Sequence, residues 1–466
     1  MKNYLVFTMA TLLLGTACSS KKEHAEGFTG APGEVKLITL DPGHFHAALV
    51  QKVSYPQVSK DVYVYAPTGF DVNEHLKRIE GFNTRAENPT LWNEIVYTGT
   101  DYLEKMLAEK KGNVMIQAGN NGKKTEYIKK TLEAGINVLS DKPMAINSQN
   151  FKLLEECFDI ARQKNVLLYD IMTERNEITT MLQRELSTIP AIYGEQLKGS
   201  PDEPAIVKES VHHLFKLVDN KPLTRPVWYF DVTQQGEGIV DVTTHLVDLV
   251  QWEAFPEQII DYKKDIELVD ANRWTTSISP EEFKQVKGTD AYPDFLKKDV
   301  ENDTLKVYCN GDIVYKIKGV TAKVSVIWNY TFPEGGGDTH FSVMKGSKAD
   351  LIIRQGQEQG YKPELYIEAL PDIDLAAYEK ELAAAMSTVA DKYPGVALDK
   401  VSDNVWQVQI PATYRVGHEA HFGQVMENYL QYLQDGKLPD WEVPNMIAKY
   451  YVTTHALEMA KVKAKK

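Results

Sequence analysis

The sequence has little cysteine, no excess of positive charge and no long apolar run. Its three cysteines, Cys18, Cys157 and Cys309, are too few for a disulfide framework, although a single Cys157–Cys309 disulfide is possible. The sequence has 52 Lys and Arg residues and 65 Asp and Glu residues, which gives a net charge of −13. Because this charge repels phosphate backbones, we expect no nucleic-acid partner. With 466 residues, 43% hydrophobic and 25% charged, the composition is that of a soluble globular protein of two or three domains.

The first residues form a targeting segment. The chain is apolar over residues 4–14, and the small residues 15–17 precede Cys18. This run is too short for a stable transmembrane helix and has the layout of a cleaved secretory signal. Small residues directly before a cysteine resemble a bacterial lipobox, which predicts a signal peptide over residues 1–17 and a lipid on Cys18. The alternative is an ordinary signal peptide in which the cysteine is incidental.

Residues 18–33 are polar and contain Gly and Pro, which suits a tether between a membrane and a folded domain. No early acidic run follows Cys18, and this favours an anchor that faces the periplasm. We therefore expect a lipid-anchored periplasmic protein whose remaining chain is soluble.

Short apolar runs alternate with segments of helical periodicity over residues 34–171. This alternation predicts βαβ units in a doubly wound parallel sheet, and Ala134-Gly135 is expected to end one of the helices. The expected strands are residues 35–40, 62–65, 94–97, 114–118, 137–139 and 166–169, and the expected helices are residues 101–110, 124–134 and 148–164.

Longer strand-like runs predominate after residue 171, which predicts a second domain over residues 172–466. Its large, mostly antiparallel sheet would be covered by helices, so the fold class is α/β followed by α+β. The expected strands are residues 227–232, 304–308, 312–316, 322–330, 340–343 and 350–354, and the expected helices are residues 238–253, 416–435 and 445–463.

Residues 34–51 read as strand, turn and helix, and they carry a degenerate dinucleotide fingerprint. Where the fingerprint has three glycines the chain has Asp41, Gly43 and His46, so only the glycine at which the backbone approaches a diphosphate remains. Asp41 would bring negative charge towards that diphosphate, and His46 would push the helix away from the strand. The second strand also ends without the expected acidic residue. Taken alone, the turn is explained equally well as an irregular turn after a sheet strand.

Two later segments carry more chemistry. An Asp-Lys-Pro turn follows a short strand and places Lys142 at the carboxyl edge of the parallel sheet, where ligands bind. Further on, Asp241, His245 and Asp248 follow spacings of four and three residues, so we expect their side chains along one stripe of a helix. Polar groups on such a stripe either line a cleft or form a structural Asp–His pair.

Together, the strand–turn–helix of residues 35–51, the Ala-Gly…Asp-Lys-Pro segment and the Gly-x-x-Asp-x-x-x-His-x-x-Asp helix resemble the Gfo/Idh/MocA oxidoreductase family. The resemblance runs in order over residues 34–252. It implies a Rossmann domain over residues 34–171 that binds NAD or NADP, and a C-terminal α/β domain for substrate. It also implies a homo-oligomer, dimer or tetramer, formed through the C-terminal sheet.

The resemblance further implies that Lys142, Asp241 and His245 form the catalytic group. In chemical terms, oxidation of a secondary alcohol needs a base, and an imidazole with an unperturbed pKa of ~6.5 suits that role. Asp241 would fix the tautomer of His245, and Lys142 would stabilise the developing alkoxide. Lys124, expected on the outer face of its helix, would be dispensable. The residues expected to bind the cofactor are Asp41, Gly43, His44, Phe45, His46, Ala118, Asn120, Asp141 and Lys142.

Charged and aromatic side chains elsewhere suit a carbohydrate, which offers hydroxyls and an apolar ring face. The expected substrate contacts are Glu174, Arg175, His212, His213, Arg225 and Trp228, although each also has an ordinary structural interpretation. A metal site made of His212, His213 and His245 is an alternative that lacks compact ligand spacing, so we expect no metal.

The leading hypothesis is an exported NAD(P)-dependent oxidoreductase that converts a ring hydroxyl of a sugar or glycoside into a ketone, with its cofactor tightly held. One alternative is a glycoside hydrolase that uses transient oxidation at C3. Another is a sugar-binding lipoprotein without catalytic activity, which the degenerate glycine motif would explain.

Overall fold

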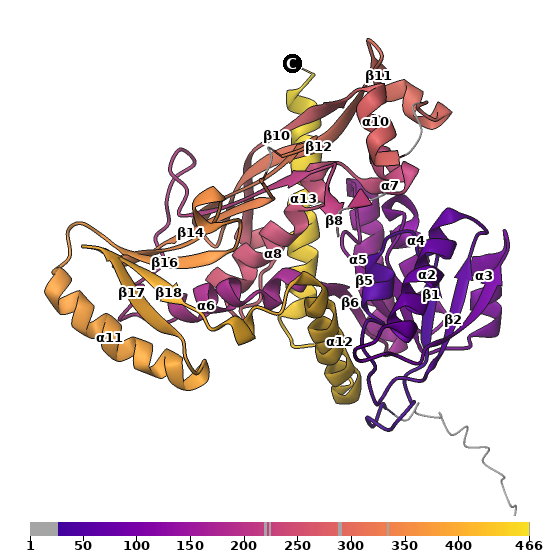
Figure 1. Ribbon diagram of the computed structural model, residues 1–466, viewed down its shortest axis with the longest axis horizontal. Coiled ribbons are helices and arrows are strands. Elements are labelled where there is room, and N and C mark those ends of the chain that lie inside the picture. The colour runs from indigo at the N-terminus through magenta and orange to yellow at the C-terminus, as the bar shows by residue number, and fades with distance from the viewer. Residues whose placement is uncertain (1–26, 219–220, 223–224, 288–290, 333–334, 466) are drawn as a thin grey trace, which may run out of the picture.

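The computed structural model describes residues 27–218, 221–222, 225–287, 291–332 and 335–465. The predicted signal peptide and Cys18, the residue predicted to be lipidated, lie outside these residues. Within the described ranges, no helix is both long enough and apolar enough to pass through a bilayer. The chain forms two domains that lie side by side, with the last two helices between them (Figure 1).

The N-terminal domain is a six-stranded parallel sheet flanked by helices, which confirms the predicted doubly wound architecture. The strand order β3-β2-β1-β4-β5-β6 reverses between β1 and β4, and ligands of such sheets bind in the crevice at that reversal. The strands are β1 (Leu37–Leu40), β2 (Asp61–Ala66), β3 (Asn93–Thr98), β4 (Val114–Gln117), β5 (Asn137–Asp141) and β6 (Leu168–Ile171). The helices are α1 (His46–Leu49), α2 (Phe70–Thr84), α3 (Tyr102–Glu109), α4 (Asn121–Glu133) and α5 (Ser148–Lys164).

Local chemistry explains these elements. Every residue of β1, β4, β5 and β6 is buried, as expected for parallel strands with helices on both faces. Asn120 caps α4 by accepting a hydrogen bond from the Gly122 amide, and Asn147 caps α5 in the same way. Gly135 has a φ of +79° directly after α4, which confirms the predicted helix end.

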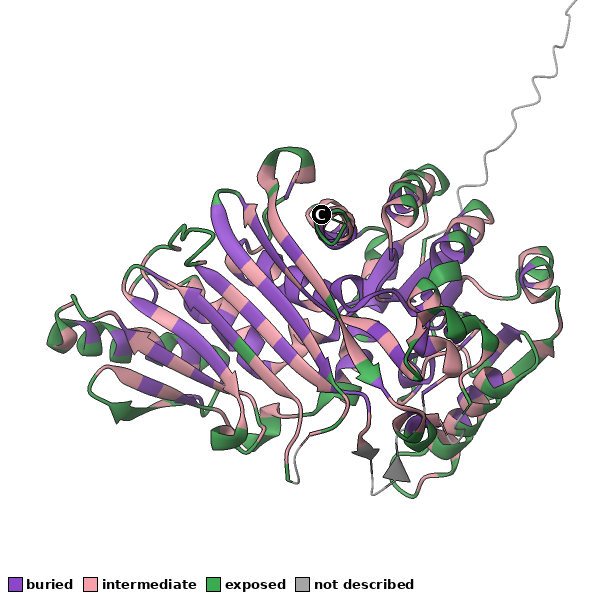
Figure 2. Ribbon diagram, turned by 90° about the horizontal axis from the view of Figure 1, so that it is seen from above, coloured by how far each residue is buried: buried purple, intermediate pink, exposed green. Residues whose placement is uncertain are grey.

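The C-terminal domain is built on a ten-stranded sheet of order β10-β12-β13-β7-β14-β15-β16-β18-β17, with β11 paired to β12. All its pairs are antiparallel except β13 with β7, so the predicted mostly antiparallel sheet is confirmed. Buried and half-exposed residues alternate along the strands of this sheet (Figure 2), which is typical of a sheet covered on one face. The strands are β7 (Ile206–His213), β10 (Ile266–Ile278), β11 (Val300–Glu301), β12 (Thr304–Ile317), β13 (Val320–Asn329), β14 (Thr339–Lys345), β15 (Ala349–Gln355), β16 (Glu364–Ala369), β17 (Ala397–Ser402) and β18 (Val405–Gln409).

The helices α6, α8 and α13 pack against this sheet. The helices of the domain are α6 (Ile178–Ser187), α7 (Val232–Gln235), α8 (Thr243–Ala254), α9 (Tyr262–Asp265), α10 (Pro280–Lys287), α11 (Leu375–Lys392), α12 (His418–Asp435) and α13 (Glu442–Lys463).

Four predicted elements differ from the structure. Residues 227–232 are not a strand: a 3-10 helix over Val227–Phe230 leads into α7, whose first turn is capped by the Asp231 carboxylate. The two strands expected at 304–308 and 312–316 are one continuous strand, β12. The helix expected to begin at residue 238 begins at Thr243, after a 3-10 turn, so Asp241 precedes it.

The helices α12 and α13 return to the first domain. Phe422, Met426 and Tyr429 of α12 and Tyr450 of α13 belong to the same buried cluster as the Rossmann strands. Tyr169 of β6 stacks on Tyr429 with ring centroids 6.1 Å apart. The core of the N-terminal domain is therefore completed by the end of the chain.

Candidate active site

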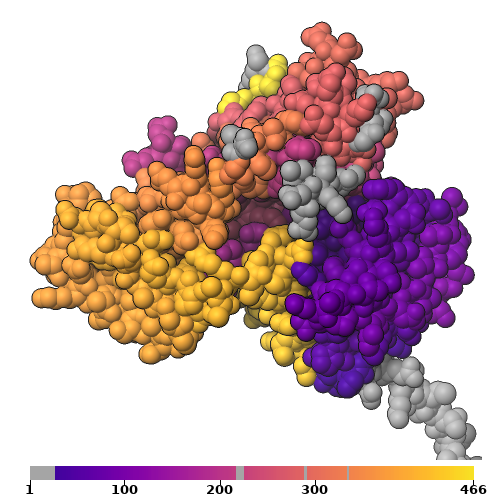
Figure 3. Space-filling model, viewed as in Figure 1, coloured from indigo at the N-terminus to yellow at the C-terminus, as the bar shows by residue number. Residues whose placement is uncertain are grey.

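A cavity of about 420 Å³ lies at the carboxyl edge of the parallel sheet, where the two domains meet. Figure 3 shows a hollow on this side of the molecule between the Rossmann domain, α12 and the C-terminal sheet. Predicted residues that line the cavity are His44, Phe45, His46, Asp141, Lys142, Glu174, His212, Arg225, Asp241 and His245. The sequence analysis did not select the further lining residues Asn121, Lys216, Tyr229, Gln235, Trp328, Asp338 and His418.

Lys142 and Asp241 form an ion pair across this cavity. Lys142 follows β5 of the first domain, and its Nζ lies 2.6 Å from Asp241 Oδ1 of the second domain. Both side chains are about nine-tenths buried, and Asp241 Oδ2 accepts a second hydrogen bond from Gln235 Nε2 at 3.0 Å. A hydrogen bond to an ionised group in such surroundings is strong and fixes both partners. The ammonium group is thus positioned for a substrate oxygen that enters beside it.

His245 lies near this pair without belonging to it. Its Nδ1 is buried and has no hydrogen-bond partner among the described residues. Burial, assisted by the charge of Lys142, holds the pKa of His245 well below its ordinary value, so the imidazole is neutral near pH 7. A neutral imidazole accepts a proton. Asp241 was expected to fix the tautomer of His245, but among the described residues its oxygens accept from Lys142 and Gln235, and His245 Nδ1 has no partner.

The turn after β1 has backbone features of a dinucleotide fingerprint, although its side chains differ from those of the fingerprint. Asp41 has a φ of 45°, the left-handed conformation in which that fingerprint places a glycine. Its carboxylate points away from the turn and accepts a hydrogen bond from the Tyr127 hydroxyl at 3.0 Å. The Gly43 and His44 amides both donate to the Ala118 carbonyl at 3.1 Å. A Cβ on Gly119 would lie 2.4 Å from the Asp41 carbonyl oxygen, so only glycine permits this approach.

A second cavity, of about 560 Å³, lies beyond the end of β2. Asp41 and Trp228 line it, and a small space of about 50 Å³ shares lining residues with both cavities and so lies next to each. The three spaces follow the crevice at the β1/β4 reversal and together offer the extended site that a dinucleotide needs. Cations that line them include Arg78, Arg225 and Lys287, which suit a diphosphate in place of the missing glycines.

Trp228 lies within this crevice. Its Nε1 donates to Asp71 Oδ2 at 2.8 Å, and a Cβ on Gly43 would lie 3.0 Å from its ring. Trp228 therefore lines the dinucleotide side of the crevice and is absent from the lining of the 420 Å³ cavity, for which it had been expected.

Asp338, which also lines the cavity, binds three basic side chains. Its two carboxylate oxygens accept from His212 Nδ1 at 3.2 Å and His213 Nδ1 at 3.0 Å, and Lys216 Nζ also binds it. These partners lower the pKa of Asp338 despite its burial. The alternative metal site of His212, His213 and His245 is not supported, because the first two imidazoles face this carboxylate.

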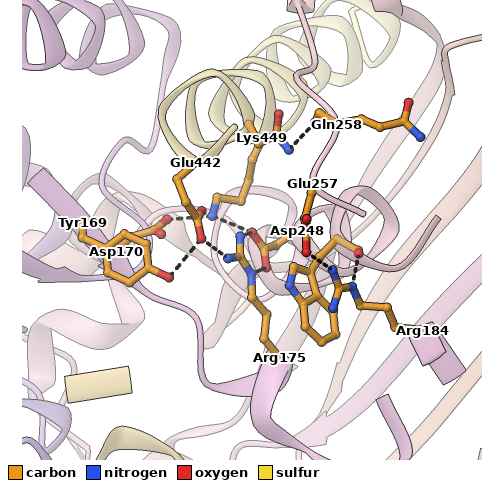
Figure 4. A network of polar contacts seen from close by, with 11 residues as sticks. Tyr169, Asp170, Arg175, Arg184, Asp248, Glu257, Gln258, Glu442 and Lys449 are labelled. Atoms are coloured by element: carbon orange, nitrogen blue, oxygen red, sulfur yellow. Dashed lines mark hydrogen bonds and ion pairs between the residues drawn. The ribbon is translucent and has the colours of Figure 1, made fainter. Parts of the chain in front are cut away.

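Arg175 is predicted as a substrate contact, but it does not line the cavity and is buried in a polar network (Figure 4). Its guanidinium forms a bidentate pair with Asp248 at 2.7 Å and reaches Glu442 at 2.8 Å. Lys449 of α13 links Asp248 to Asp170 of β6 at 2.8 and 2.7 Å. This network joins both domains and holds the helix that carries His245.

The remaining predicted residues have structural roles or lie at the rim. His213 is buried behind the cavity, Ala118 contributes its carbonyl to the β1 turn, and Asn120 caps α4. Glu174 lines the cavity beside His418, 3.7 Å away. Lys124 is not on an outer face: it is fully buried and donates to the Asp141 carbonyl at 2.8 Å. Burial lowers the pKa of Lys124 to about 8.

Comparisons with known proteins agree with this architecture. A family model described as "Oxidoreductase family, NAD-binding Rossmann fold" matches residues 72–170, and one described as "Putative oxidoreductase C terminal domain" matches residues 182–461. The fold and site therefore define an NAD-binding oxidoreductase. The chain belongs to the Gfo/Idh/MocA oxidoreductase family.

Solved structures resemble the whole chain. The crystal structure of a protein described as a putative oxidoreductase from Parabacteroides merdae is 88% identical, covers 94% of this chain and 100% of its own, and has a TM-score of 0.93. A levoglucosan dehydrogenase in complex with NADH is 13% identical over 92% of this chain and 97% of its own, with a TM-score of 0.59. A 3-ketoreductase from Actinomadura kijaniata in complex with TDP-benzene and NADP is 13% identical over 91% and 97%, with a TM-score of 0.55. The last two show a shared fold only, and no curated protein matches the chain.

Proposed function

We propose that the protein oxidises a ring hydroxyl of a sugar or glycoside to a ketone with NAD or NADP. The Lys142–Asp241 ion pair, placed beside a neutral His245 in one cavity, is the observation that carries this proposal. A bound nicotinamide supplies the hydride acceptor. Lys142 Nζ donates to the reacting oxygen and stabilises its developing charge, and His245 takes the hydroxyl proton.

The walls of the cavity suit a carbohydrate. Tyr229 and Trp328 offer aromatic faces against which the apolar side of a sugar ring can pack, while Glu174, His212 and Arg225 offer partners for hydroxyls. The similarly folded levoglucosan dehydrogenase binds NADH and levoglucosan, which supports a sugar substrate for this chain.

The test is a panel of free sugars and aryl glycosides incubated with NAD or NADP while reduced nicotinamide is monitored. The wild-type protein should reduce cofactor with at least one member, and the Asp241→Asn variant should be inactive. Asp294→Asn, at a fully exposed surface carboxylate, is the matched control and should keep wild-type activity. No cofactor binding and no reduction with any sugar would favour a non-catalytic sugar-binding protein instead.

A second candidate is glycoside cleavage through transient oxidation at C3. It is favoured by the His212–Asp338 pair in the cavity lining, which gives the cavity a further acid–base group beyond those needed for hydride transfer. Release of aglycone without net accumulation of reduced nicotinamide would identify this reaction.

The N-terminal sequence supports an exported protein with a lipid on Cys18, anchored on the periplasmic side. Because that compartment maintains no free nicotinamide pool, we propose that the cofactor is retained and recycled in place by a second sugar or an external acceptor. Protein purified without added cofactor and then denatured should release NAD or NADP. Rapid exchange of added NAD with sequential kinetics would contradict retention.

A further inference from the structure

Two histidines and one aspartate converge at the edge of the sheet, beside the catalytic ion pair. His44 and His46 follow β1, and Asp141 ends β5. Asp141 Oδ2 lies 3.0 Å from His46 Nδ1 and 3.9 Å from His44 Nδ1, and all three donor atoms lie within 4.8 Å of one another. The proposed hydride transfer uses none of these side chains.

Hydrogen bonds within the protein explain only part of this convergence. His46 Nδ1 and Asp141 Oδ2 form a hydrogen bond at 3.0 Å, whereas His44 Nδ1 lies 3.9 Å from the same oxygen, too far for one. The His46 amide donates to His44 Nδ1 at 3.4 Å, so that nitrogen is the unprotonated one and carries a lone pair. It lies beside the carboxylate oxygen of Asp141 without a hydrogen bond to it. A cation bound by both atoms would replace the long amide contact of His44 and the His46–Asp141 hydrogen bond with metal–ligand bonds.

The surroundings hold the three groups in place. His46 packs on Phe422 of α12 with ring centroids 4.6 Å apart, and its imidazole meets the His44 ring edge-on at 4.0 Å. The nearest ammonium groups are otherwise engaged: Lys142 pairs with Asp241, and Lys124 binds the Asp141 carbonyl.

We propose that His44, His46 and Asp141 bind a divalent transition-metal ion, with zinc the best match. Two imidazole nitrogens and one carboxylate oxygen form a set that zinc uses in catalytic sites, whereas magnesium and calcium prefer oxygen ligands. All three residues line the 420 Å³ cavity, as do Lys142 and Asp241, so the ion would border the space in which we propose that substrate binds. The ion would take an oxygen of the sugar as its next ligand and orient it in the cavity.

The site is tested by metal binding without cofactor or sugar, so its failure is distinct from failure of the proposed function. Full-length, untagged protein is stripped with chelator and titrated with Co²⁺ alone, then with Zn²⁺ alone. We expect one equivalent of Co²⁺ per chain with a visible absorption band, displaced by Zn²⁺. His44→Gln and Asp141→Asn should each raise the dissociation constant at least ~100-fold, because even the loss of an outer-shell partner costs 10–100-fold.

His455→Gln, on α13 and far along the chain from these loops, is the matched control and should bind like the wild type. Absence of binding by the wild type, or unchanged affinity in His44→Gln and Asp141→Asn, would overturn the proposal. If those variants do not fold, anomalous diffraction at the zinc edge from wild-type crystals soaked in Zn²⁺ decides it. A peak between the three side chains supports the site, and its absence there refutes it.

Discussion

Lys142 Nζ and Asp241 Oδ1 lie 2.6 Å apart although they belong to different domains, and their contact is the chemical centre of the cavity between those domains. Each residue fixes the other: the carboxylate orients the ammonium group, and the ammonium group compensates a carboxylate that is nine-tenths buried. A substrate oxygen placed beside the pair therefore meets an ammonium group that is already oriented.

The ion pair predicts that Lys142→Met lowers kcat about 10²–10⁴-fold, because the developing alkoxide loses its charged partner. Lys77→Met, on the exposed surface of α2, is the control and should keep wild-type kcat. Steady-state kinetics on the substrate identified by the sugar panel measure both. Wild-type kcat in Lys142→Met would remove this residue from the reaction.

His245 predicts the pH dependence. Its pKa is lowered by burial, so the imidazole stays neutral, and able to accept a proton, below the ordinary pKa of ~6.5. The acidic limb of kcat/KM should therefore fall below pH ~6.5, and this limb should be absent from the residual activity of His245→Gln. A limb at or above pH 6.5 in the wild type, unchanged in the variant, would assign the base to another group.

Lys449 predicts a large effect on stability. It is fully buried between Asp170 and Asp248, so Lys449→Met leaves two buried carboxylates without their common cation. We expect the free energy of unfolding of Lys449→Met to be lower than that of the wild type by ~3–5 kcal/mol. The control is Lys463→Met, whose ion pair with Asp270 is exposed, and it should lose only ~0–1 kcal/mol. Urea denaturation followed by circular dichroism compares the two. Equal losses would show that the network does not hold the domains together.

Glu94 predicts a stabilising substitution. Burial raises the pKa of this β3 carboxyl from 4.5 to about 7, so the folded state binds its proton more tightly than the unfolded state. Stability from this group is present below pH 4.5 and is lost as pH rises towards 7. Glu94→Gln, which keeps an acceptor for Gln51 Nε2, should gain up to about 3 kcal/mol at pH 8 and nothing at pH 4. Thermal unfolding at both pH values tests this, with exposed Glu87→Gln as the control.

The order of elements in the first domain could be predicted because buried parallel strands and amphipathic helices have distinct periodicities. The spacing of polar residues was a less reliable guide to which side chains lie together. The spacing of Asp241, His245 and Asp248 indicated one stripe, but the helix begins at Thr243, and the three side chains have three different environments. The 3-10 turn that separates Asp241 from the helix is not visible in periodicity.

Some residues reach the cavity only through contacts between distant segments, and their place in its lining could not be predicted. Asp338, Lys216 and His418 line the cavity through the pairing of β7 with β14 and the return of α12, neither of which has a local sequence signal. The sequence predicts Arg175 as a substrate contact and Lys124 as an exposed residue on an outer helix face. Their burial depends on carboxylate and carbonyl partners contributed by other elements.

The return of α12 and α13 to the first domain has a consequence for how the protein is made. Phe422, Met426 and Tyr429 fill the same core as β1, so this core stays open until nearly the whole chain has left the ribosome. Contacts of such sequence separation form slowly, and the unfinished sheet exposes apolar surface in the meantime. The Rossmann half is therefore not a module that can be expressed alone. A chain truncated before residue 418 should aggregate rather than yield a free dinucleotide-binding domain.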